Sequence, residues 1–211
     1  MTSIRETIHN HAMNGSPPAE AKYSSLVIPS LAWVIVAVIY TFRRSINSAG
    51  FPIDPYYSIL FAIPILLILA KKFPFADLGI RLGKPLTGLF FVLLLPGILF
   101  LRYYLTGANL VLPENLGILI PGSIAEEFFF RGYLQESLQK TLGTGYSFFL
   151  TNLLFALLHF IKGYSLAPTL VVGVIGFYFS LAKDQKQGGG SLIYPTISHI
   201  LYNIVSSGVS R

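Results

Sequence analysis

The feature that most constrains this chain is a pair of adjacent carboxylates inside a long apolar stretch. Glu126 and Glu127 lie within residues 116–138, and Arg131 follows four residues after Glu127. A charge deep in a bilayer costs roughly 2.5–3.5 kcal/mol, so these side chains need partners or a water-filled cavity. On a helix Glu127 and Arg131 lie one turn apart and can pair, whereas Glu126 is rotated by about 100°. We therefore expect Arg131 to hold Glu127 and Glu126 to be free for chemistry.

Composition places the rest of the chain in a membrane. Of its 211 residues, 53% are hydrophobic and only 11% are charged, whereas about 25% of the residues of a soluble domain are charged. The net charge of +6 does not indicate nucleic acid, because the basic residues lie in short loops at the ends of apolar runs. The chain has no cysteine, which excludes disulfides and thiolate chemistry.

The apolar runs predict an all-α, polytopic membrane bundle of about seven transmembrane helices, with six to eight allowed. Residues 1–22 are expected to form a polar N-terminal tail, and residues 23–211 a single transmembrane domain. Pro121 and Gly122 are expected to break the helix just before the glutamates and to expose backbone groups near Glu126. The predicted spans cover residues 24–42, 55–70, 86–105, 116–138, 146–161, 166–182 and 191–209.

The basic residues between these spans predict the orientation. With seven spans, nine of the fifteen lysines and arginines fall on the side of the N-terminus and five on the other. This excess predicts a cytoplasmic N-terminus. The nine are Arg5, Lys22, Lys71, Lys72, Arg81, Lys84, Lys140, Lys183 and Lys186, and the five are Arg43, Arg44, Arg102, Lys162 and Arg211.

Histidines occur in the apolar spans at two positions, His159 and His199. With the glutamates they place ionisable groups on three separate helices, and a single buried site shared by these helices is the economical explanation. Asn203 lies one helical turn after His199, so its amide is on the same face. Each feature alone has an ordinary explanation, such as a salt bridge or an interhelical hydrogen bond. Together they predict a functional site.

Two chemistries suit this set of side chains. In the first, Glu126 and His159 activate water for proteolysis, and His199 and Asn203 donate hydrogen bonds to the oxyanion of the tetrahedral intermediate. In the second, Glu126, His159 and His199 bind zinc as a two-histidine, one-carboxylate set. The sequence has no His-Glu-x-x-His motif, so a metal site depends wholly on how the helices meet.

Three segments resemble the motifs of the CPBP family, which comprises the CAAX proteases and bacteriocin-processing enzymes (also called ABI) and is related to the Rce1-type prenyl protease. The order of the segments and the spacing within each of them match, and the resemblance covers residues 78–208. The segments are Glu126-Glu127-Phe-Phe-Phe-Arg131-Gly132, Phe155-Ala-Leu-Leu-His159 and His199-Ile-Leu-Tyr-Asn203.

The resemblance implies an intramembrane endopeptidase of the glutamate type. By position, Glu126 would be the catalytic carboxylate and His159 its partner on water, while His199 and Asn203 would form the oxyanion hole. The supporting residues would be Glu127 and Arg131. The resemblance favours a mechanism without a cofactor, and zinc on Glu126, His159 and His199 stays as the alternative.

The same resemblance implies the partners and the location. Membrane lipid and a peptide or protein substrate are expected, and the substrate is prenylated in the eukaryotic relatives. The chain is short for those enzymes and resembles small bacterial members, so a multi-pass protein of the bacterial cytoplasmic membrane is expected.

Two other classes of function stay open from the sequence. A non-catalytic bacteriocin-immunity or scaffold protein would bind a peptide in the same cavity, and it would keep that binding in Glu126→Gln. A transporter or channel would use a buried acid–histidine relay, although the sequence shows neither repeated halves nor paired broken helices.

Overall fold

The computed structural model describes residues 19–48 and 54–210, and most of these residues are helical. The predicted tail, residues 1–22, lies largely outside this part, and the first described helix begins at Ala19. The α-helices are α2 (Ala19–Ser48), α3 (Pro55–Leu69), α4 (Pro85–Leu105), α5 (Leu116–Glu127), α6 (Gln135–Leu142), α7 (Thr144–Ile161), α8 (Leu166–Lys183) and α9 (Ile193–Ser207). The shorter elements are the 3₁₀ turn η1 (Phe75–Leu78), the π-helical segment η2 (Phe128–Leu134) and the antiparallel strands β1 (Asn109–Leu110) and β2 (Val209–Ser210).

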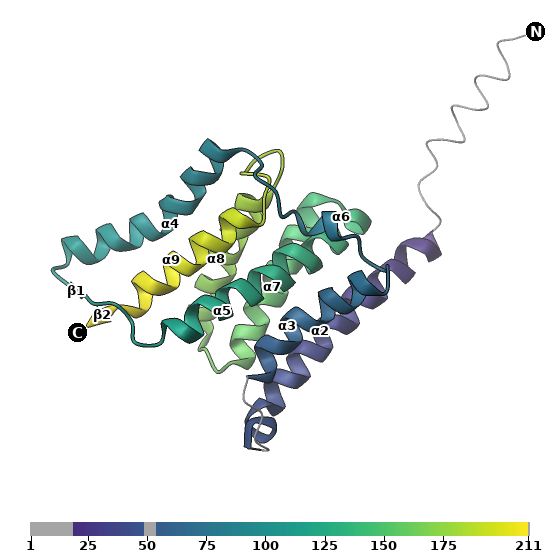
Figure 1. Cartoon of the computed structure of the whole chain (residues 1–211), viewed down its shortest axis with the longest axis horizontal. Coiled ribbons are helices and arrows are strands. Elements are labelled where there is room, and N and C mark those ends of the chain that lie inside the picture. The colour runs from purple at the N-terminus through teal and green to yellow at the C-terminus, as the bar shows by residue number, and fades with distance from the viewer. Residues whose placement is uncertain (1–18, 49–53, 211) are drawn as a thin grey trace, which may run out of the picture.

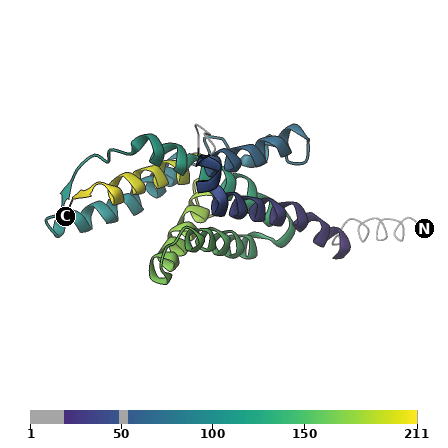
Figure 2. The same ribbon diagram turned by 90° about the horizontal axis from the view of Figure 1, so that it is seen from below.

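The helices pack in pairs around a central helix. α2 packs against α3, α7 against α8, and α4 against α9. α5 contacts both α3 and α9, so it lies between these two helices (Figure 1). Viewed at 90°, α9 with α4 and the helix α2 extend toward opposite sides of the molecule (Figure 2). This arrangement places the glutamates of α5 at the centre of the bundle.

The predicted all-α membrane bundle is confirmed. Each of the seven predicted spans corresponds to a helix, and the fourth is formed by α5, η2 and α6 in succession. Four segments are long and apolar enough to cross a membrane, namely Ser25–Asn47, Pro85–Leu105, Thr144–Ile161 and Leu166–Lys183. Large apolar side chains such as Leu89, Phe149 and Val174 are exposed on them, as expected for helices that face lipid.

The helix break expected at Pro121 and Gly122 was wrong. α5 runs through both residues from Leu116 to Glu127. Proline removes the hydrogen bond to the carbonyl four residues earlier. That carbonyl belongs to Gly117, which is exposed in the first turn, so its loss does not interrupt the helix.

The irregular backbone lies after the glutamates instead, where η2 is π-helical. Its aromatic side chains Phe129, Phe130 and Tyr133 are buried in the core. Phe130 contacts Phe155 of α7 with a ring-centroid distance of 4.9 Å, nearly edge to face. π-Helical turns are frequent at functional sites, and this one carries Arg131 on a segment that the core fixes against α7.

Candidate active site

The four residues that the sequence suggested for chemistry lie around one cavity of about 310 Å³. Glu126 comes from α5, His159 from α7, and His199 and Asn203 from α9. Ser206 of α9 lines the cavity as well. Three helices therefore bring these side chains together, as their separate positions in the sequence led us to expect.

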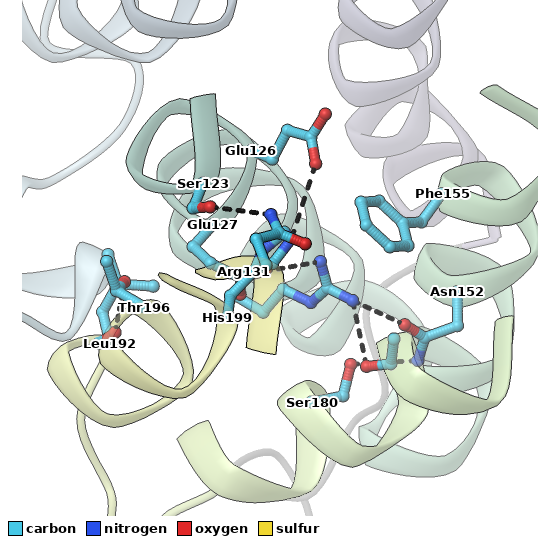
Figure 3. Close-up of polar contacts among 12 residues, drawn as sticks. Ser123, Glu126, Glu127, Arg131, Asn152, Phe155, Ser180, Leu192, Thr196 and His199 are labelled. Atoms are coloured by element: carbon cyan, nitrogen blue, oxygen red, sulfur yellow. Dashed lines mark hydrogen bonds and ion pairs between the residues drawn. The ribbon is translucent and has the colours of Figure 1, made fainter. Parts of the chain in front are cut away.

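The expected pair of Glu127 and Arg131 is present behind this cavity. Arg131 Nη1 lies 3.1 Å from Glu127 Oε1, and both side chains are 0% exposed. Arg131 Nη2 donates to Asn152 Oδ1 at 3.1 Å and to the Gly176 carbonyl at 2.9 Å (Figure 3). The guanidinium carbon also lies 4.3 Å from the centroid of the Phe155 ring. Arg131 thus joins η2, α7 and α8 by contacts to one buried cation.

Gly176 lies where the Arg131 side chain approaches α8. A Cβ there would be 2.7 Å from Asn152 Oδ1 and 2.8 Å from Arg131 Nη2. We expect Gly176→Ala to cost about 1–3 kcal/mol of stability through overpacking, seen as a lower unfolding temperature in detergent. Gly173→Ala is the control, because its Cβ would meet Ala156 Cβ at 3.4 Å. Equal unfolding temperatures for both variants would contradict the expectation.

His199 is oriented by Glu127. Its Nδ1 lies 2.9 Å from Glu127 Oε1, and a carboxylate only accepts hydrogen bonds, so Nδ1 carries the proton. The ring stacks on Phe179 at a centroid distance of 4.8 Å. Its other nitrogen, Nε2, lies 3.9 Å from Glu126 Oε2 (Figure 3). Glu127 therefore contacts both Arg131 and His199, and the His199 ring in turn faces Glu126.

His159 is oriented by the backbone of its own helix. Its Nδ1 lies 2.9 Å from the Phe155 carbonyl, which only accepts, so Nδ1–H is the donor and a neutral ring has its lone pair on Nε2. The ring also packs against Phe155 and Tyr164, at centroid distances of 4.6 Å and 5.4 Å. In the neutral form, His159 Nε2 is therefore a hydrogen-bond acceptor.

Asn203 is oriented by α5. Its Nδ2 donates to Ser123 Oγ at 2.9 Å, and Ser123 Oγ donates to the Leu119 carbonyl at 2.8 Å. An amide nitrogen has two protons, so this contact uses one of them. Asn203 and His199 lie four residues apart on α9 and line the same cavity. The α9 helix therefore presents two polar side chains to the space beside Glu126.

Glu126 is not free, contrary to the expectation from its position. Its Oε1 accepts a hydrogen bond from the Tyr56 hydroxyl at 2.9 Å and one from Lys162 Nζ at 2.5 Å. In the sequence, Tyr56 lies at the start of the predicted span 55–70, and Lys162 was counted among the basic residues between spans. Helix packing explains the difference, because α3 contacts α5 and buries Tyr56. The available signal was the three-residue spacing from His159 to Lys162, the C-cap of α7, which puts both on one side of the helix end.

Lys183 was also assigned to a loop, and it too is buried. Its Nζ donates to the Arg131 carbonyl at 2.6 Å and lies 3.1 Å from Glu136 Oε2. The end of α8 is thereby attached to the backbone of η2. Lys183 and Lys162 had been counted on opposite sides of the membrane. Leaving both out removes one residue from each side, so the excess of basic residues still lies on the side of the N-terminus.

The alternative zinc set is not supported by the geometry. In residues 19–48 and 54–210, no group of three or more His, Cys, Asp or Glu side chains could hold a metal ion. This includes Glu126, His159 and His199. The Lys162 ammonium lies 2.5 Å from Glu126 Oε1, and its charge opposes a second cation at that oxygen.

Residues 108–205 match the family model of Rce1-like type II CAAX prenyl endopeptidases. The matched region contains all three motif segments and Lys162, whereas Tyr56 lies before it. No curated protein and no solved structure matches the chain significantly.

Proposed function

Because this chain belongs, through residues 108–205, to the Rce1-like family, we propose that it is an intramembrane endopeptidase. It would hydrolyse a peptide bond in a membrane-associated peptide or protein tail by means of glutamate-activated water. The observation that carries the proposal is the convergence of Glu126, His159, His199 and Asn203 on one cavity. A carboxylate, two imidazoles and an amide can supply the base and the oxyanion donors that hydrolysis by water uses.

Glu126 acts as the general base in this proposal. Its Oε1 already accepts two hydrogen bonds, so Oε2 takes the proton from water. His159 Nε2 accepts the second hydrogen of the same water and thereby directs the oxygen lone pair at the scissile carbonyl. The protonated Glu126 then delivers its proton to the leaving amine, and the carboxylate is regenerated.

His199 and Asn203 stabilise the oxyanion of the tetrahedral intermediate. Because His199 donates through Nδ1 to Glu127, its Nε2 can donate as well only when the imidazole is protonated. The ring lies between two carboxylates, because Glu127 Oε1 is 2.9 Å from Nδ1 and Glu126 Oε2 is 3.9 Å from Nε2. Asn203 supplies the Nδ2 proton that Ser123 does not use. Together the two residues present two donors to one oxygen.

The location follows the same reasoning and is part of the proposal. We place the protein in a bacterial cytoplasmic membrane with a cytoplasmic N-terminus, on the excess of lysines and arginines on that side. Its substrate is a peptide or protein that reaches the cavity from the membrane, with or without an attached lipid. Tag-accessibility measurements at both ends of the chain would test the orientation.

The proposal is tested by comparing the peptide termini in membranes from cells that carry the wild type or Glu126→Gln. A terminus that is present only with the wild type would identify both the activity and the substrate. Identical termini, with both proteins equally expressed and folded, would contradict proteolysis in that host. If a protected or bound partner persists with Glu126→Gln, the cavity serves a non-catalytic immunity or scaffold role instead.

A further inference from the structure

The geometry points to Lys162 and Tyr56 as positioning residues, which hold one oxygen of Glu126 so that the other faces His199. This inference rests on the proposed function. It assigns the two residues no contact with the substrate, and it concerns only the orientation of the base.

Both donors bind the same carboxylate oxygen. The Tyr56 hydroxyl lies 2.9 Å from Glu126 Oε1, and Lys162 Nζ lies 2.5 Å from it. The terminal torsion of a glutamate side chain has a broad, nearly two-fold distribution. Two donors from different helices restrict this torsion. They fix which oxygen points to α3 and α7 and which is left for the cavity.

Lys162 is itself held in place, unlike a solvated lysine at a helix end. Its Nζ lies 4.5 Å from the ring centroid of Tyr56 and 5.7 Å from that of Tyr40, and the side chain is 13% exposed. Tyr40 and Tyr56 pack edge to face at 5.1 Å. An ammonium near aromatic faces is stabilised by their quadrupoles. Lys162, directly after α7, is therefore enclosed by groups from α2, α3 and α5.

The other oxygen, Oε2, faces His199. Its distance from His199 Nε2 is 3.9 Å, which exceeds a direct hydrogen bond and which one water can bridge. If Lys162 and Tyr56 were absent, the carboxylate could rotate toward His199 and form a direct ion pair. The base would then be occupied by the group that is meant to stabilise the oxyanion.

Helices α2 and α3, which precede the matched region, take part in the proposed active site. Tyr56 lies in α3, outside the matched residues 108–205. Its aromatic neighbour Tyr40 lies in α2. α2 and α3 therefore contribute side chains to the surroundings of Glu126.

The test uses the absence of cysteine in this chain. Lys162→Cys introduces a single thiol into the purified full-length protein. Its thiolate displaces bromide from 2-bromoethylamine to give a side chain that ends in an ammonium, and it displaces iodide from iodoacetamide to give a neutral amide. Turnover is measured on the peptide whose terminus is lost in Glu126→Gln. Lys140→Cys is the matched control, because Lys140 is 49% exposed and pairs with Asp77 outside the cavity.

We expect Lys162→Cys to lower kcat by about 100-fold, with KM changed by less than about twofold, because the base is misplaced while the substrate still binds. 2-Bromoethylamine should restore kcat to within about tenfold of the wild type, whereas iodoacetamide should not. Tyr56→Phe, which keeps the ring, should lower kcat by about tenfold. Lys140→Cys should behave as the wild type with either reagent.

Full kcat in Lys162→Cys would overturn the inference, as would equal rescue by both reagents, since rescue would then depend on volume and not on charge. If Lys162→Cys does not fold, Tyr56→Phe decides, and wild-type kcat in that variant is the contrary result. If Glu126→Gln is inactive and Lys162→Cys is fully active, only the positioning role of Lys162 is contradicted. Full activity of Glu126→Gln would instead contradict the proposed function itself.

Discussion

Arg131→Ala should yield little folded protein. The substitution leaves Glu127, which is 0% exposed, without its cationic partner, and it also removes the donors to Asn152 and to the Gly176 carbonyl. Removal of one member of a buried ion pair costs about 3–5 kcal/mol, a large part of a typical stability of about 5–15 kcal/mol. We expect a strongly reduced monodisperse fraction in detergent and a lower unfolding temperature.

A double variant without either charge separates the effect of losing the ion pair from the effect of losing side-chain volume. Glu127→Gln combined with Arg131→Met removes both charges and should recover part of the stability that Arg131→Ala loses. Arg102→Ala serves as the control, because Arg102 is exposed at the end of α4. An Arg131→Ala protein with the yield and unfolding temperature of the wild type would show that the Glu127 charge is stabilised by other groups.

Glu126→Gln should lower kcat by about 10²–10⁴-fold, the range for loss of a general base. The fold should be kept, because the glutamine carbonyl can still accept from Tyr56 and Lys162 while the amide cannot take a proton from water. The measurement is turnover of the substrate that the comparison of termini identifies. Glu114→Gln, in the exposed loop before α5, should retain wild-type turnover.

A double-mutant cycle with His159→Ala tests whether both residues act on one water. If they do, the double variant should lose about as much as the worse single variant, because groups that act as a unit are strongly non-additive. Losses that multiply would mean that Glu126 and His159 act in separate steps. Asn203, the proposed oxyanion donor, offers a contrast. Asn203→Ala should reduce turnover in a protein whose Glu126 is intact.

Local spacing was sufficient where both partners lie on one helix. Glu127 and Arg131 are four residues apart and pair as expected. His199 and Asn203 share a face of α9 and line one cavity. On α9 the period of the α-helix determines the shared face. Arg131 lies in the π-helical segment η2, which continues α5 without interruption, and the pair with Glu127 still forms. The break predicted at Pro121 was wrong, because a missing hydrogen bond in an exposed first turn costs little.

Spacing could not reveal the groups that bind Glu126. Tyr56 and Lys162 lie 70 and 36 residues away from it in the sequence. At the end of an apolar run, an aromatic or a lysine is usually an interfacial anchor. Whether such a side chain turns into the bundle depends on how α3, α5 and α7 are rotated about their axes, and hydropathy contains little information on that rotation.

The sequence by itself determined that this chain is a helical membrane protein and that its buried charges must share partners, because apolar length and the cost of a charge in hydrocarbon are properties of single segments. The partners of Glu126, by contrast, follow only from the way the helices pack. The tertiary structure placed Lys162 and Tyr56 on one oxygen of Glu126 and left the other oxygen toward His199. Those contacts join separate helices, and packing between helices fixes them.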